Sequence, residues 1–364
     1  MKKTLLNLLL VLVSTLIALL LAEVVIRAVN PVNVRSTWLQ MHDRGFFVNN
    51  PGGNHLHTFE DRRVRYQFSP EGFRGEGINP DKKNILFFGD SFTFGLLVEE
   101  EDTITGNLRS LFDDHVPGHN LNLINGGIGG SGLADWVAFY EVFRDDLDVD
   151  AVVLVFNHSD VMRSLARNLF VLKDEELLPS KRWEERKIKH ILNRSSLYKW
   201  LQENSHIVSG FSTWSWSYMH PDLTNMFSQD ETRVLIPTAE ELETESDYVI
   251  RISSELLNRF RLMTQKDERT LLAVSTGFLV DEDLHAFDKR FHEHADSLFP
   301  FYDIPWKDLT PEVKEKAGGD LESVRIPVDR HPDEKGYQYA AESMFDFLIN
   351  QPDIQNLLNP EHAD

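Results

Sequence analysis

Short apolar runs alternate with amphipathic stretches over residues 84–350 of this 364-residue chain. The runs at 85–88, 121–124, 151–156 and 271–275 have the length and composition of buried strands. The stretches at 103–112, 134–145, 248–263 and 282–297 are predicted to be helices. The clearest helix is the last one, with Pro332 in its first turn and its apolar residues on one face. This order predicts an α/β fold, a doubly wound parallel sheet with helices on both faces.

The N-terminus carries the longest apolar run. After Lys2 and Lys3, residues 4–22 are almost wholly apolar, with Asn7, Ser14 and Thr15 as interruptions. This length suits one transmembrane helix. A cleavable signal sequence ending near Ala22 is the alternative, for which Leu20 is a poor cleavage context. The two lysines predict that the N-terminus lies in the cytoplasm and the bulk of the chain outside. Because the chain has no cysteine, this fits a single pass through a bacterial inner (cytoplasmic) membrane, with the bulk of the chain periplasmic or extracellular.

Changes in pattern along the chain predict its organisation. We expect a membrane anchor over 1–29, a lead-in segment over 30–83, a main domain over 84–350 and a tail over 351–364. Regular spacing fails over 162–244, which predicts an insertion beside the active site. It contains a basic stretch at 181–189 and an aromatic group, whose members either stack on sugar rings or pack helices together. The group comprises Phe211, Trp214, Trp216 and Tyr218.

Composition and charge narrow the possible functions. The chain is 41% hydrophobic and 26% charged, as in globular proteins. Its 58 acidic residues exceed the 37 Lys and Arg residues, and a net charge of -21 argues against nucleic acid or a polyanionic polymer as a ligand. With no cysteine there is no disulfide or thiolate metal site. No metalloprotease-like spacing occurs, so we predict neither metal nor cofactor.

Three blocks of residues could carry chemistry. Gly89-Asp90-Ser91 follows the first strand, where a hydroxyl would lie at the ligand-binding edge of the sheet, although this is also a common turn sequence. A glycine-rich turn spans 125–132. Near the C-terminus, Asp329 stands two residues before His331, so in an extended segment its carboxylate could hold the imidazole. Pro332 favours that extended conformation.

In order and spacing these blocks resemble those of the SGNH (GDSL-like) hydrolase superfamily. The resemblance covers about residues 84–350, apart from a long stretch in the middle that does not match the family. The resemblance implies a Ser91 nucleophile, a His331 base oriented by Asp329, and an oxyanion hole using the Ser91 and Gly130 amides. The third donor in the family is an asparagine in a Gly-x-Asn-Asp block. This chain instead has 157–160 as Asn-His-Ser-Asp, so either the Ser159 hydroxyl or the Asn157 side chain would serve.

The resemblance implies a serine-dependent ester hydrolase that forms an acyl-enzyme. The expected substrate is an acylated, O-acetylated cell-envelope glycan or a similar small ester. An O-acetyltransferase with the same triad and a non-catalytic glycan-binding protein remain alternatives. Besides this substrate, the membrane is the one partner that we predict, through the N-terminal helix. We expect no binding to nucleic acid, and the sequence predicts no particular protein partner.

Overall fold

The structure is a computed structural model that describes residues 2–29, 38–173, 176–180, 196–208, 210–211, 239–280, 284 and 286–358. The chain divides into two compact units. One unit comprises Met1–Thr37, His55–Arg63 and Lys187–Ile236, and the other comprises Trp38–Asn54, Val64–Arg186 and Pro237–Asp364. The domain bounds expected from the sequence remain predictions.

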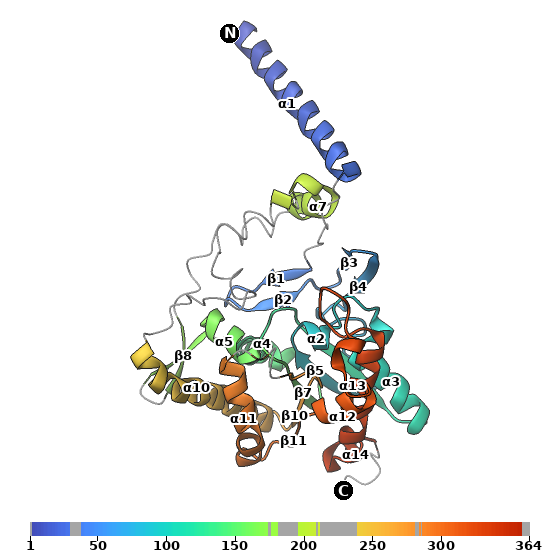
Figure 1. The fold of residues 1–364 in the computed structure, drawn as a ribbon, viewed down its shortest axis with the longest axis vertical. Helices are drawn as coiled ribbons and strands as arrows, with labels where there is room; N and C mark the ends of the chain where they lie inside the picture. The colour runs from blue at the N-terminus through green and yellow to red at the C-terminus, as the bar shows by residue number, and fades with distance from the viewer. Residues whose placement is uncertain are drawn as a thin grey trace. The chain divides into compact units, whose positions relative to one another are not determined.

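The second unit is built on a parallel five-stranded sheet, in the order β11-β10-β7-β5-β6. Its strands are β5 (Lys83–Gly89), β6 (Leu121–Gly127), β7 (Ala151–Phe156), β10 (Thr270–Ser275) and β11 (Trp306–Lys307). Helices cover both faces of this sheet (Figure 1). The predicted doubly wound α/β fold is therefore confirmed, with β11 as an additional edge strand that the sequence did not reveal.

Alternate residues of each central strand enter two separate cores. Leu86 and Phe88 of β5 pack in the core formed with α4 (Leu133–Phe143), α10 (Ala239–Lys266) and α11 (Ala286–Phe301). Ile85 and Phe87 enter the opposite core, formed with α3 (Ile104–His115), α12 (Thr310–Lys316) and α13 (Glu334–Leu348). Because both faces are covered, these strands are continuously apolar rather than alternating.

The helix ends show which local signals are used. The sequence leaves Asp102 or Thr103 as the cap of α3, and in the structure it is the Thr103 side chain that accepts a hydrogen bond from Gly106 N. At α13 the cap is Asp333, which accepts from Gly336 N, so Pro332 precedes the helix instead of opening it. The predicted tail contains a further helix, α14 (Pro352–Leu358), whose Ile354 is buried against the second core.

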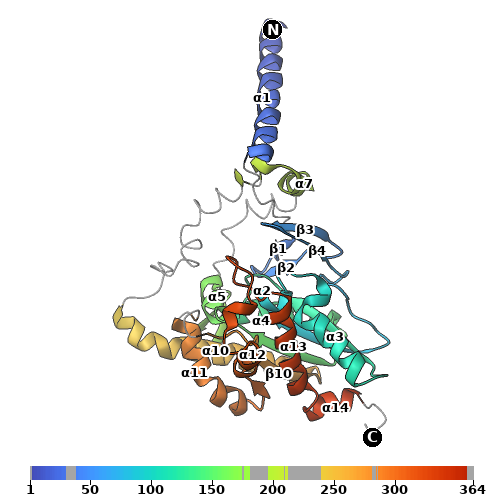
Figure 2. The same cartoon turned by 45° about the vertical axis from the view of Figure 1, so that its right-hand side comes forward.

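The described chain also contains shorter elements, several of which are labelled in Figure 2. They are β1 (Leu39–Met41), β2 (Phe47–Asn49), β3 (Asn54–Phe59), β4 (Arg62–Gln67), α2 (Ser91–Phe94), α5 (Asp160–Arg167), β8 (Phe170–Lys173), β9 (Glu176–Pro179) and α7 (Ser196–Asn204). Of the predicted insertion, α5 and the β8–β9 pair belong to the sheet-containing unit. The basic stretch at 181–189, Trp214, Trp216 and Tyr218 lie outside the described residues.

The apolar N-terminus forms one helix, α1 (Lys2–Val29). The helix over Lys3–Val29 is long and apolar enough to cross a membrane, with a mean hydropathy of 2.8 over its 18-residue window, and a signal sequence would meet the same criterion.

Candidate active site

Ser91 lies at the first turn of α2, directly after β5. Asp90 caps this short helix by accepting a hydrogen bond from Phe92 N at 2.8 Å. Gly127 at the end of β6 allows α2 to approach closely, because a Cβ there would stand 2.2 Å from Phe94 N. The hydroxyl is thus fixed at the carboxyl end of β5, the strand that lies between β6 and β7 and at which the strand order reverses.

Ser91, His331 and Asp329 form one line of hydrogen bonds. His331 Nε2 lies 2.8 Å from Ser91 Oγ, and His331 Nδ1 lies 2.5 Å from Asp329 Oδ1. The serine is only 8% exposed, and the side chains of the other two are each 16% exposed. A hydroxyl in contact with an imidazole, itself held by a carboxylate, is the arrangement in which serine can be activated as a nucleophile.

The backbone around Asp329 is not the extended segment that the sequence predicted. Val328 and Arg330 have φ angles of 70° and 71°, in the left-handed region on either side of the aspartate. Ile326 N donates to His331 O at 2.8 Å and closes the segment into a tight loop. The carboxylate reaches the imidazole through this loop. Non-glycine residues in this region cost energy and are concentrated at functional sites.

The glycine turn joins β6 to α4 beside the serine. Ile128 N and Ser131 Oγ both donate to Gly89 O, at 3.0 and 3.1 Å, which ties the turn to the end of β5. Gly130 has a φ of 71°, and a Cβ at this position would meet only open space. Its carbonyl accepts from Arg167 Nη2 at 2.8 Å, and its N–H has no partner among the described residues.

The two candidates for the third oxyanion donor have different surroundings. Asn157 is fully buried, and its Nδ2 donates to Asp90 Oδ2 at 3.0 Å. Ser159, 6% exposed, precedes α5 without capping it through its side chain, and its hydroxyl has no partner within the described part of the chain. The Asn157 amide is thus engaged inside the protein, whereas the Ser159 hydroxyl is free to bind another group.

These surroundings make opposite predictions for two substitutions. If Ser159 donates to the oxyanion, Ser159→Ala should lower kcat by about 10²–10³-fold and leave KM nearly unchanged, because the bond forms in the transition state. Asn157→Ala should chiefly lower the free energy of unfolding, because Asp90 loses a buried donor. Steady-state kinetics and urea unfolding of both variants test this. A loss of kcat at full stability in Asn157→Ala would contradict the assignment.

A buried group of charges behind Ser91 was not foreseen from the sequence. Arg163 Nη1 contacts the carboxylates of both Asp90 and Asp160, and the Asp160 carboxylate also accepts from Asn157 N at 2.6 Å. Burial and the Asp90 charge raise the pKa of Asp160 well above its usual value. Burial would also raise the pKa of Asp90, but Arg163 and Asn157 outweigh it and hold that pKa low. Asp90 is therefore the charged partner of Arg163.

A third buried carboxylate, Asp288 of α11, accepts hydrogen bonds from Val161 N and Met162 N at the start of α5. Burial raises the pKa of Asp288 to about 7, against these bonds, which lower it. The folded-state pKa of Asp288 lies above the unfolded value of about 3.9, so its protonated carboxyl stabilises the folded state. This contribution is fully present only below about pH 4. That stabilisation is lost as the pH rises towards 7, because the unfolded chain releases the proton first.

We therefore expect the free energy of unfolding to fall by up to about 1.4 kcal/mol per pH unit between pH 4 and 7 through this one group. Asp288→Asn should flatten the slope, since asparagine keeps an acceptor without titrating. Urea unfolding at several pH values measures it, with Asp346→Asn on the exposed side of α13 as the control. Equal slopes in the wild type and Asp288→Asn would show that Asp288 does not titrate in this range.

A second residue that the sequence analysis did not identify, Arg74, binds the backbone at the C-terminal end of α2. It is fully buried, and its guanidinium donates to the carbonyl oxygens of Phe94, Gly95 and Val98. Its Cζ lies 4.7 Å from the ring centroids of both Tyr66 and Phe94. The lead-in segment, expected only to pack on the main domain, thus supplies a cation to the C-terminal end of the helix that carries Ser91.

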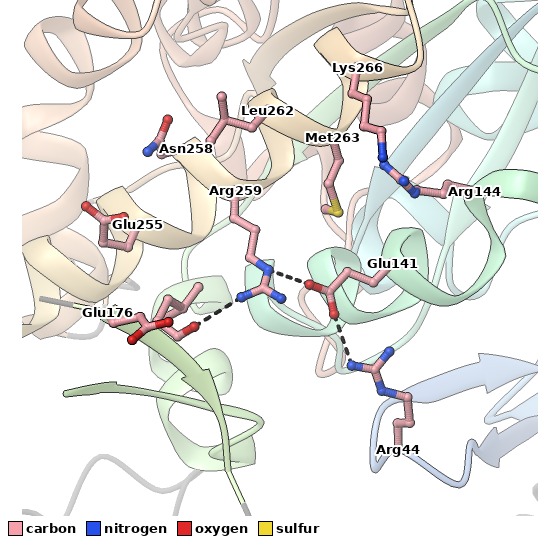
Figure 3. A pocket seen from close by; sticks show the side chains of 11 residues that line it. Arg44, Glu141, Arg144, Glu176, Glu255, Asn258, Arg259, Leu262, Met263 and Lys266 are labelled. Atoms are coloured by element: carbon pink, nitrogen blue, oxygen red, sulfur yellow. Dashed lines mark hydrogen bonds and ion pairs between the residues drawn. The ribbon is translucent and has the colours of Figure 1, made fainter.

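A cavity of about 720 Å³ lies elsewhere, along α4 and α10, and its lining includes none of Ser91, His331 and Asp329. Figure 3 shows Glu141 between Arg44 and Arg259, with an ion pair to each. These charges satisfy one another, so we assign the cavity no catalytic role. Among the described residues no group of three or more His, Asp or Glu side chains could hold a metal ion.

No family model and no curated protein matches the chain. Its fold is similar to several solved structures. A lipolytic G-D-S-L family protein from Veillonella parvula is 13% identical, with 74% of this chain and 100% of that chain covered and a TM-score of 0.41. An acetyl xylan esterase, Axe2, from Geobacillus stearothermophilus is 14% identical (73% and 94% covered, TM-score 0.41). The esterase EstA from a Pseudoalteromonas species is 10% identical (73% and 96%, TM-score 0.40).

Proposed function

We propose that this protein is a serine-dependent ester hydrolase of the SGNH type, with Ser91 as nucleophile, His331 as general base and Asp329 as the group that orients it. The observation that carries the proposal is the hydrogen-bonded line from Ser91 Oγ to His331 Nε2 and from His331 Nδ1 to Asp329. The buried charges behind Ser91 and the Arg74 support beneath α2 hold the hydroxyl in place.

The reaction follows from these positions. Ser91 Oγ attacks the ester carbonyl carbon while His331 Nε2 takes the hydroxyl proton. Negative charge moves to the carbonyl oxygen, where the amides of Ser91 and Gly130 and the Ser159 hydroxyl donate to it. The C–O bond breaks, His331 returns the proton to the leaving alcohol, and the acyl group stays on Ser91. Water, deprotonated by His331, then attacks the acyl-enzyme, releasing the acid and restoring the serine.

For the substrate we propose an uncharged, O-acetylated cell-envelope glycan or a similar ester. A net charge of -21 would repel a polyanionic polymer. We propose further that α1 remains attached and crosses the inner membrane, with the sheet-containing unit outside, where envelope glycans are found. An N-terminus beginning near Glu23, or release of the protein by alkaline washing, would contradict the anchor.

A fluorophosphonate probe tests the nucleophile. Ser91 Oγ should attack its phosphorus and expel fluoride, leaving one probe per chain on the Ser91 peptide, detectable by mass spectrometry. Ser91→Ala should remain unlabelled, while Ser159→Ala keeps the label, although more slowly. Label on a different serine would refute the assignment, and a folded wild-type protein that is neither labelled nor active on an aryl acetate would refute the enzyme.

Hydrolysis and acyl transfer share every step up to the acyl-enzyme and differ in whether water or a sugar hydroxyl attacks it. Aryl acetate turnover, followed with and without an oligosaccharide acceptor, distinguishes the two. We expect acetate to be the main product in both assays. Acetylated oligosaccharide as the main product would replace hydrolase by O-acetyltransferase and leave the roles of Ser91, His331 and Asp329 unchanged.

A further inference from the structure

Within the first compact unit, the end of α7 and the residues after it make direct contacts with the N-terminal helix. At the C-terminal end of α1 the Glu23 carboxylate accepts hydrogen bonds from Ser205 Oγ, His206 N and Ile207 N, at 2.8–3.0 Å. One turn further, Arg27 donates to Asn204 O at the end of α7 and pairs with Glu23. Figures 1 and 2 both show α7 beside this end of α1.

These contacts fix the depth of α7 relative to the apolar run of α1. Residues 4–22, at a rise of 1.5 Å each, span about 28 Å, close to the roughly 30 Å hydrocarbon thickness of a bilayer. Glu23 is the first charged residue after that run, and Arg27 follows within about 8 Å. Both lie where a membrane-crossing α1 enters the polar headgroup layer, about 5–8 Å thick on each side. The end of α7 lies at the same level.

α7 carries exposed apolar side chains. Leu197 and Trp200, three residues apart on one face of the helix, are 66% and 57% exposed. Phe211 beyond the helix is 63% exposed. Within α1, burial is confined to the same end: Glu23 and Ile26 are partly covered, and the other residues from 3 to 29 are exposed. Tryptophan suits the membrane interface because its ring is apolar and its N–H is polar.

We propose that α7 is an interfacial helix, held in the outer headgroup layer by Glu23 and Arg27, with Leu197 and Trp200 in contact with lipid. The inference rests on the proposed membrane anchor and adds a second site of membrane contact. Lipid is the partner favoured for this apolar surface, because the bonds to Glu23 and Arg27 hold the end of α7 at the depth of the headgroups.

The absence of cysteine allows a direct test by single-site spin labelling. Leu197→Cys and Trp200→Cys are labelled in the full chain, reconstituted into phosphatidylcholine vesicles. Leu10→Cys, in the middle of the apolar run, is the lipid reference, and Phe301→Cys, 77% exposed on α11, is the reference in the sheet-containing unit. Accessibility to oxygen, which concentrates in lipid, is compared with accessibility to a water-soluble nickel chelate.

We expect the oxygen-to-nickel ratio at 197 and 200 to lie between the two references. A ratio equal to that at 301, or low accessibility to both reagents as under a protein partner, would overturn the interfacial helix while leaving the anchor intact. A water-accessible label at position 10 would instead refute the anchor, and this inference with it. The double variant Glu23→Gln, Arg27→Gln should shift the ratio at 197 towards that at 301.

A second measurement introduces no label into the helix. Phosphatidylcholine brominated near the top of its acyl chains should quench part of the tryptophan fluorescence of the wild-type protein. In Trp200→Phe, which keeps an apolar ring at that position, the quenched fraction should fall. Equal quenching in both proteins would overturn the placement of Trp200 in lipid.

Discussion

Replacing His331 by alanine is expected to lower kcat for an aryl acetate by roughly 10⁴–10⁶-fold, because Ser91 then has no group to accept its proton. Asp329→Ala should cost less, about 10⁴-fold, since the imidazole remains but is poorly held. The double variant should be scarcely worse than His331→Ala, because the two residues act as a unit. Stopped assays with purified protein measure these losses.

His294→Ala provides the matched control, since this histidine contacts Arg290 O within its own helix and none of the three aligned residues. Its activity and thermal midpoint should equal those of the wild type. The His331→Ala protein should also melt close to the wild type, because the residue lies in a loop whose bridge is made by its backbone. Wild-type turnover in His331→Ala would give the role of base to another residue.

Arg163→Met is expected to lower the free energy of unfolding by about 3–5 kcal/mol, because it leaves the buried Asp90 carboxylate without its cation. Methionine retains most of the volume, so lost charge rather than a cavity should dominate. Arg163→Met with Asp90→Asn should recover part of the loss, since the amide carries no charge. Denaturant unfolding measures all three proteins.

An exposed ion pair supplies the comparison. Arg290 and Glu293 are 3.5 Å apart with both side chains about half exposed, so Arg290→Met should change stability by less than about 1 kcal/mol. A loss in Arg163→Met no larger than this would mean that the buried charges are reached by water and make little contribution. Activity should fall with stability in Arg163→Met, because Asp90 also caps the helix that carries Ser91.

The sheet could be predicted because its strands are buried on both faces, and β7 agrees with the sequence at both ends. The prediction missed β11, which is two residues long and only half-buried, so it leaves no apolar run. The prediction placed the start of the last helix at Pro332 because proline favours a first turn. In the structure Asp333 takes the cap instead, since its carboxylate reaches Gly336 N.

Around the candidate site, contacts between neighbours in sequence were predictable and long-range contacts were not. The spacing of Asp329 and His331 predicted their contact, although the backbone achieves it by a left-handed loop. Arg163 lies 73 residues from Asp90 in the sequence, and the hydrophobic pattern of the two segments does not predict the ion pair between these residues. The aspartate in the Gly-Asp-Ser block was visible and caps α2 through its neighbour Phe92, but its pairing with Arg163 appears only once α5 is placed.

Arg74 binds three backbone carbonyls and no carboxylate in the helix-end region it supports. Substitutions at 94, 95 and 98 therefore leave its acceptors in place. Removing the N-terminal segment that contains Arg74, in contrast, removes the donor itself. A chain begun at residue 83 would keep every strand of the sheet and Ser91, Asp329 and His331, but it would lack this cation.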